Sequence, residues 1–82
     1  LVVDDEVDAR QLLVQALTFY GATVVAAQSA QEALSALEAK NPDALVSDIG
    51  MPDEDGYSLI RRVRALPDYH HREISALALT AF

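Results

Sequence analysis

Acidic side chains gather in two short segments of the chain, and carboxylates brought together there would hold a divalent cation. Two unit charges about 4 Å apart repel by roughly 4 kcal/mol at an effective dielectric of about 20. Such a cluster therefore raises a pKa or recruits a cation. Mg²⁺ suits it, because this ion takes hard oxygen ligands and keeps waters that phosphoryl oxygens can replace. The two segments contain Asp4, Asp5, Glu6 and Asp8, and Asp48, Asp53, Glu54 and Asp55.

Three of these carboxylates stand where apolar runs end. Residues 1–3 are apolar and stop at Asp4 and Asp5, and residues 44–47 stop at Asp48. In a parallel sheet the carboxyl ends of the strands share one edge, so we expect these side chains to converge. A fourth apolar run ends near Thr80, whose hydroxyl would reach the same edge. A metal-braced carboxylate beside a hydroxyl is the chemistry of phosphoryl capture.

The elements that must position these groups follow from hydrophobic periodicity. Short apolar runs alternate with stripes of helical spacing, which predicts the order β-α-β-α-β-α-β and a parallel sheet covered by helices on both faces. In a sheet with the strand order 2-1-3-4, successive strands are first added on one side of strand 1 and then on the other. The strand order would therefore reverse between the first and third strands, beside the carboxylates. The predicted elements cover, in chain order, residues 1–3, 8–20, 23–27, 29–40, 44–47, 59–66 and 74–79.

Local signals predict where the helices begin and end. Asp8 is expected to cap the first helix, with Gln11 reaching back to it, and Gly21 to end this helix in a left-handed conformation. Ser29 and Glu32 form a capping box at the start of the second helix. The apolar stripes of the helices are predicted to be core.

Composition excludes several classes of protein. The chain has 82 residues, 51% of them hydrophobic, which predicts one small folded domain. It has no cysteine, so a disulfide scaffold and a thiolate zinc site are excluded and a cytoplasmic location is expected. The net charge of −7 predicts no nucleic-acid binding by this domain itself. No apolar run approaches the roughly 18 residues that cross a bilayer, so no membrane contact is expected of this segment.

Four ordered motifs in this sequence resemble the receiver domain of two-component response regulators. The resemblance implies a flavodoxin-like, doubly wound α/β fold with the strand order 2-1-3-4. It also implies a signalling domain that assists only its own phosphorylation and dephosphorylation. The motifs span almost the whole chain: LVVDDE at residues 1–6, LVSDIGMP at residues 45–52, Asp55-Gly56 and LALTA at residues 77–81.

The resemblance also implies a role for each matching residue. Asp48 would be the phosphoacceptor, taking a phosphoryl group from a phosphohistidine. Mg²⁺ would be bound directly by Asp5, through a water by Asp4, and also by Asp48 and the backbone carbonyl of Gly50. Thr80 would donate its hydroxyl to the phosphoryl group and switch the conformation. The implied partners are a histidine kinase or a histidine phosphotransfer domain, with an output or kinase domain in the same parent chain.

The chain departs from the family pattern at its C-terminus. The family continues with a helix, a fifth strand carrying a lysine, an aromatic switch residue and a last helix, whereas this sequence stops at Phe82. We therefore expect residues 1–82 to be a single receiver domain that is C-terminally incomplete, and we assign neither the lysine nor the aromatic switch. Residues 74–82 resemble receivers attached to hybrid sensor histidine kinases.

Two other functions remain open. A magnesium-dependent phosphohydrolase also uses strand-end aspartates, although the first strand here lacks the Asp-x-Asp pattern of such enzymes. A receiver-like interaction module would keep the fold without taking phosphate. Among the other polar clusters, residues 53–55 are interpreted as a solvated loop, His70-His71 as a polar loop, and the arginines at positions 61, 62 and 64 as the solvated face of the third helix.

Overall fold

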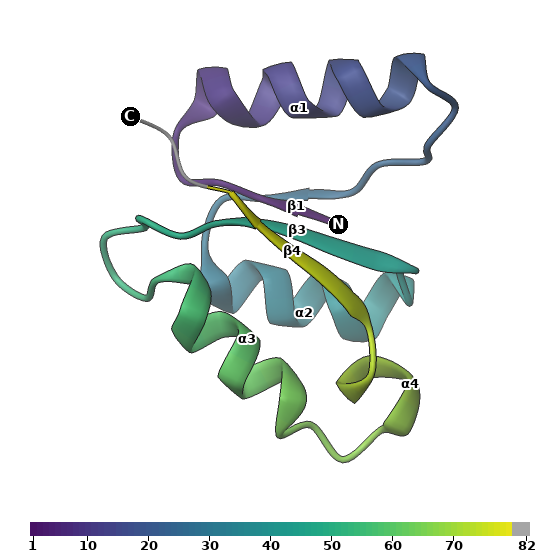
Figure 1. Cartoon of the computed structure of the whole chain (residues 1–82), viewed down its shortest axis with the longest axis vertical. Coiled ribbons are helices and arrows are strands. Elements are labelled where there is room, and N and C mark those ends of the chain that lie inside the picture. The colour runs from purple at the N-terminus through teal and green to yellow at the C-terminus, as the bar shows by residue number, and fades with distance from the viewer. Residues whose placement is uncertain (80–82) are drawn as a thin grey trace.

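The computed structural model describes residues 1–79 of the chain. Strands and helices alternate as predicted, with one additional short helix before the last strand (Figure 1). No helix within this described part is long and apolar enough to cross a membrane. The elements are β1 (Val2–Val3), α1 (Val7–Phe19), β2 (Ala26–Ala27), α2 (Ala30–Lys40), β3 (Ala44–Asp48), α3 (Gly56–Arg64), α4 (Tyr69–Arg72) and β4 (Ser75–Leu79).

The four strands form one parallel sheet in the order β2-β1-β3-β4, which confirms the predicted order. Helix α1 covers one face of the sheet, and α2 and α3 cover the other (Figure 1). The fold is therefore the predicted flavodoxin-like, doubly wound α/β arrangement. Because all strands run in the same direction, their carboxyl ends lie along one edge, where β1 and β3 are direct neighbours.

The core lies between the sheet and the helices α2 and α3. Its fully buried side chains include Val3, Leu37, Leu45, Leu59 and Val63. Each contributes roughly 1.5–3 kcal/mol relative to an exposed position. This packing fixes α3, and with it the loop that precedes α3, against the end of β3.

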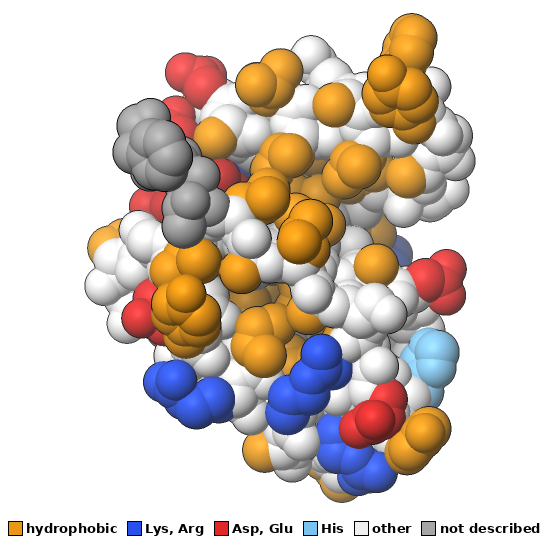
Figure 2. Space-filling model, in the orientation of Figure 1, with side chains coloured by type: hydrophobic (Ala, Val, Ile, Leu, Met, Phe, Trp, Pro, Cys, Tyr) orange, Lys and Arg blue, Asp and Glu red, His pale blue; other side chains and the backbone are white. Residues whose placement is uncertain are grey.

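Helix α1 does not bury its apolar stripe, so the prediction of a core face there is wrong for the described residues. No residue of α1 is buried, and Leu12 is 68% exposed. Figure 2 shows hydrophobic side chains gathered along this helix and across the strands beside it. The physical reason is that α1 is the only helix on its face of the sheet within residues 1–79, so its outer side meets no neighbour.

The helix ends agree with the predictions at two of the three sites. Gly21 has a φ of +94°, as expected for a left-handed helix end, and Ser29 accepts a hydrogen bond from the Glu32 amide at 3.1 Å. The cap of α1 is Glu6 rather than Asp8, because the helix begins at Val7. The Glu6 carboxylate accepts the Asp8 amide at 3.1 Å.

Two further elements differ from the predictions. Strand β2 covers only Ala26–Ala27 instead of residues 23–27, because the partner strand β1 offers two residues for pairing. The predicted polar loop around His70-His71 contains helix α4, capped by Asp68, whose carboxylate accepts the His71 amide at 3.2 Å. Neither histidine belongs to a group of metal-ligating side chains within residues 1–79.

Candidate functional site

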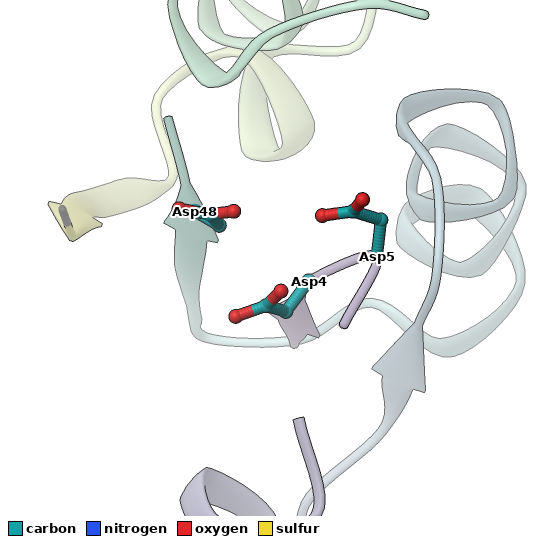
Figure 3. Close-up of side chains that lie close together, drawn as sticks. All are labelled: Asp4, Asp5 and Asp48. Atoms are coloured by element: carbon teal, nitrogen blue, oxygen red, sulfur yellow. The ribbon is translucent and has the colours of Figure 1, made fainter. Parts of the chain in front are cut away.

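Three carboxylates converge at the carboxyl edge of the sheet. Asp4 and Asp5 follow β1, Asp48 ends β3, and the parallel pairing of Val3 with Ser47 brings the two strand ends together. One oxygen from each carboxylate lies within 4.8 Å of the others. Figure 3 shows the Asp5 and Asp48 side chains pointing toward one another, with Asp4 alongside. The predicted convergence is confirmed, and the role of each residue stays a prediction.

Asp4 is the buried member of this acidic cluster. It is 7% exposed, and its amide donates to the Ala27 carbonyl at 3.1 Å. One of its carboxylate oxygens, Oδ1, accepts the Glu6 amide at 2.9 Å. Its other oxygen, Oδ2, accepts no hydrogen bond from residues 1–79, so it is free for a ligand.

The surroundings of Asp4 disfavour its negative charge. Burial is the main cause that raises the pKa of this carboxyl above its ordinary value, and the Glu6 amide opposes the shift. The neighbouring charges of Asp48, Asp5 and Glu6 raise the pKa of Asp4 further. A cation bound between these carboxylates would remove the repulsion, so the electrostatics of the cluster fit a metal site.

This pKa shift predicts how Asp4→Asn changes the pH dependence of stability without metal. The folded state keeps the Asp4 proton to higher pH than the unfolded state, so ionisation of Asp4 lowers the free energy of unfolding as pH rises above about 3.8. Asn cannot ionise, so the variant should gain stability relative to the natural protein as pH rises toward neutrality. Urea denaturation between acid and neutral pH, without Mg²⁺, measures this difference. A difference that stays constant with pH would contradict the prediction.

Asp48 is the half-buried member of the cluster and lies next to the end of β4. Its Oδ1 lies 3.4 Å from the Gly50 amide, a long hydrogen bond. Asp48 pairs with Leu79 across the β3–β4 ladder, and the Ile49 amide donates to the Leu79 carbonyl at 3.1 Å. Thr80 itself lies outside the described residues. The roles assigned to Gly50 and Thr80 therefore stay predictions.

The loop between β3 and α3 packs tightly against Asp48. Asp55 caps α3 by accepting the Ser58 amide at 2.8 Å, and the Gly56 amide donates to the Ile49 carbonyl at 3.0 Å. A Cβ atom on Gly56 would lie 2.6 Å from the Asp48 carbonyl oxygen. Only glycine permits this approach. Residues 53–55 lie outside the acidic cluster of the described chain, in agreement with their interpretation as a loop.

Gly56→Ala should destabilise the fold and displace Asp48. The added methyl group meets backbone atoms that cannot rotate away, so we expect the free energy of unfolding to fall by about 1–3 kcal/mol. Gly50→Ala is the matched control, because a Cβ atom there meets nothing within 4 Å. Chemical denaturation of both variants measures the difference. Equal stability of the two variants would show that the contact at Gly56 is easily relieved.

Arg10 contacts the site, although the sequence pattern predicts no role for it. Its guanidinium Nη1 donates to the backbone carbonyl of Asp4 at 2.9 Å. The available signal was a long cationic side chain one turn into the helix that follows an acidic strand end. That signal is weak, because the sequence does not show which way the side chain points.

The four-stranded parallel sheet and its strand-end carboxylates define a flavodoxin-like α/β domain with an acidic site at the topological switch point. The family model of the response regulator receiver domain matches residues 1–82. The chain therefore belongs to the response regulator receiver domain family, as the motifs predicted.

Relatives and solved structures agree with this family. The chain is 51% identical over 82 residues to an uncharacterized 14.6 kDa protein of Leptolyngbya boryana, covering all of this chain and 61% of that protein. It is 40% identical over 81 residues to the response regulator MprA of Mycolicibacterium vanbaalenii, covering 99% of this chain and 33% of MprA. The chain thus spans less than two thirds of the length of either relative.

Two solved structures show the same fold. The N-terminal domain of a response regulator receiver protein from Methanoculleus marisnigri superposes with a TM-score of 0.90 at 36% identity, over 99% of this chain and 64% of that one. The signal receiver domain of a signal transduction histidine kinase from Syntrophus aciditrophicus superposes with a TM-score of 0.87 at 31% identity, over 99% of this chain and 60% of that one.

Proposed function

We propose that this domain accepts a phosphoryl group onto Asp48 from a phosphohistidine and acts as a switch in two-component signalling. The donor would be a histidine kinase or a histidine phosphotransfer domain. The observation that carries the proposal is the convergence of Asp4, Asp5 and Asp48 at neighbouring strand ends, in a chain of the receiver family. The absence of cysteine is compatible with the cytoplasm, where we place the reaction.

The nucleophile in this proposal is a carboxylate oxygen of Asp48. The oxygen attacks phosphorus in line with the bond to the histidine nitrogen; the new O–P bond forms as the P–N bond breaks, and the imidazole leaves with the electron pair and takes up a proton. Oδ1 of Asp48 contacts the Gly50 amide, whereas Oδ2 accepts no hydrogen bond within residues 1–79. Oδ2 is therefore the oxygen that we assign as nucleophile.

The donor set of the cluster fits Mg²⁺. Three carboxylates supply hard oxygen ligands within 4.8 Å of one another, and the exposed position of Asp5 leaves room for water. We assign direct contacts to Asp5, Asp48 and the Gly50 carbonyl, and a contact through water to Asp4. When bound, the metal would neutralise the charge on the carboxylates and on the phosphoryl oxygens.

The signal would leave the site through Thr80. We assign its hydroxyl as donor to the phosphoryl group, which draws the end of β4 toward Asp48. The pairing of Leu79 with Asp48 supports this assignment, because Leu79 is the residue before Thr80 in the chain.

Phosphorylation of the full-length natural protein tests the proposal. Incubation with Mg²⁺ and acetyl phosphate, or with a phosphorylated histidine kinase, should add the mass of one phosphoryl group. Borohydride reduction of the acyl phosphate should then place it on Asp48, and EDTA should prevent the labelling. Steady turnover of small phosphate esters would instead favour the phosphohydrolase. If the protein is not labelled and its thermal stability does not change with Mg²⁺, the result would favour the interaction module.

The parent chain is a separate question, and two comparisons bear on it. The similarity to the receiver domain of the Syntrophus histidine kinase supports a hybrid sensor kinase as parent. The similarity to MprA supports a response regulator with an output domain instead. We favour the hybrid parent because residues 74–82 resemble receivers of that kind, and a histidine-kinase core elsewhere in the natural protein would establish it.

A further inference from the structure

Arg10 binds the backbone on both sides of Asp5. Its guanidinium donates from Nη1 to the Asp4 carbonyl at 2.9 Å, in a partly buried contact. Its own amide donates to the Glu6 carbonyl at 2.9 Å, as part of helix α1. Arg10 thus binds the backbone carbonyls of the two residues that flank Asp5, namely Asp4 and Glu6.

These contacts determine where the Asp5 side chain points. The Asp4 carbonyl belongs to the rigid peptide unit that joins Asp4 to Asp5. The orientation of this unit sets ψ of Asp4 and φ of Asp5, and therefore the direction of the Cα–Cβ bond of Asp5. The carboxylate of Asp5 is exposed and forms no hydrogen bond within residues 1–79, so its own contacts do not hold it in the acidic cluster.

The contact of Arg10 leaves the carboxylates available to a cation. The guanidinium binds a carbonyl oxygen, whereas an arginine on a carboxylate would compete with a metal ion for the same atoms. Arg10 therefore acts on the shape of the cluster rather than on its charge.

We propose that Arg10 is a positioning residue, which holds the Asp4–Asp5 peptide so that the Asp5 carboxylate faces Asp48 in the metal site. This inference rests on the proposed function, since it presupposes that the cluster binds Mg²⁺. It adds a residue of α1 that touches neither the ion nor the phosphoryl group. In other metal sites, residues that do not touch the metal orient its ligands through hydrogen bonds, and Arg10 would act in the same way.

The test compares Mg²⁺ affinity in variants of the full-length natural protein. Arg10→Met keeps the apolar stem and removes the donors, and we expect it to weaken Mg²⁺ binding roughly tenfold. Arg10→Lys keeps the positive charge but loses the guanidinium geometry, so its Mg²⁺ affinity should lie between those of the natural protein and Arg10→Met, and its Asp5 amide resonance should also shift. Calorimetric titration gives the dissociation constants. The amide resonance of Asp5 should shift in Arg10→Met even without metal, because its peptide unit has lost the guanidinium.

Arg61→Met is the matched control. Arg61 lies on the exposed side of α3 and forms no side-chain hydrogen bond within residues 1–79, and its replacement changes the net charge by the same amount. A net loss of positive charge alone should leave Mg²⁺ binding unchanged or slightly tighter. Opposite effects of the two substitutions would therefore support positioning by Arg10.

The outcomes separate this inference from the proposed function. If the natural protein binds Mg²⁺ and Arg10→Met binds it equally well or more tightly, Arg10 does not position the site and the proposed function stands. If the natural protein itself does not bind Mg²⁺, the metal site fails and the inference with it. Circular dichroism checks the fold of each variant. If Arg10→Met does not fold, Arg10→Lys provides the test. The proposal would be overturned if Arg10→Lys bound Mg²⁺ as tightly as Arg61→Met and its Asp5 amide resonance did not shift.

Discussion

Asp48→Asn should abolish phosphorylation of this protein. The amide of asparagine has nearly the same shape as the carboxylate but carries no nucleophilic oxygen, so the bond to phosphorus cannot form. Removal of the nucleophile in other covalent catalysts lowers the rate by about 10⁴-fold or more, and we expect labelling to fall below detection. Intact-mass measurement after incubation with acetyl phosphate and Mg²⁺ gives the result directly.

Asp53→Asn provides the control for this experiment. Asp53 is an exposed carboxylate in the loop that follows β3, and it lies outside the acidic cluster of the described residues. Its substitution removes the same charge without touching the site, so labelling should continue at the rate of the natural protein. Labelling that survives in Asp48→Asn and disappears in Asp53→Asn would move the phosphoacceptor to another residue.

Mg²⁺ should stabilise the folded protein, and Asp5→Asn should remove most of this effect. An ion that binds only the folded state raises the free energy of unfolding by about 2.7 kcal/mol at a concentration one hundred times its dissociation constant. Asp5 offers a carboxylate that no hydrogen bond within residues 1–79 engages, so it is the ligand whose loss disturbs the fold least. Thermal unfolding with and without MgCl₂, at constant ionic strength, measures the shift in Tm.

Asp8→Asn is the matched variant for the metal experiment. Asp8 is an exposed carboxylate in the first turn of α1, close to Asp5 in sequence but outside the acidic cluster. Its removal changes the net charge equally, so a response to Mg²⁺ that depended only on overall charge would fall in both variants. The site predicts a loss in Asp5→Asn alone. A Tm that does not move with Mg²⁺ in the natural protein would exclude the metal site.

The contrast between Asp48 and Arg10 shows how far a sequence can define such a site. Asp48 ends an apolar run, and the carboxyl ends of parallel strands always share an edge, so its meeting with Asp4 and Asp5 followed from pattern and topology alone. Arg10 could not be placed in this way. Its contact depends on the rotamer of a long side chain and on the path of the β1–α1 turn, which neighbouring packing decides.

The helices show the same division. Ser29 and Gly21 act through their own backbone and nearest neighbours, so their roles at helix ends could be predicted from local chemistry. The apolar stripe of α1 had the spacing of a core face, yet Leu12 is 68% exposed. A stripe shows which side of a helix can be buried, but burial also requires a neighbouring element on that side.

The amino-acid sequence by itself therefore determined the alternation of strands and helices and the three carboxylates at one edge, because these depend on periodicity and on strand direction. The strand order was predicted from the resemblance of the motifs to receiver domains. Only the tertiary structure decided that Gly56 touches the Asp48 carbonyl, that Glu6 rather than Asp8 caps α1, and that Arg10 holds the turn beside Asp5. These features depend on distances of a few ångströms between segments, and such distances result from the packing of the whole chain rather than from any local pattern.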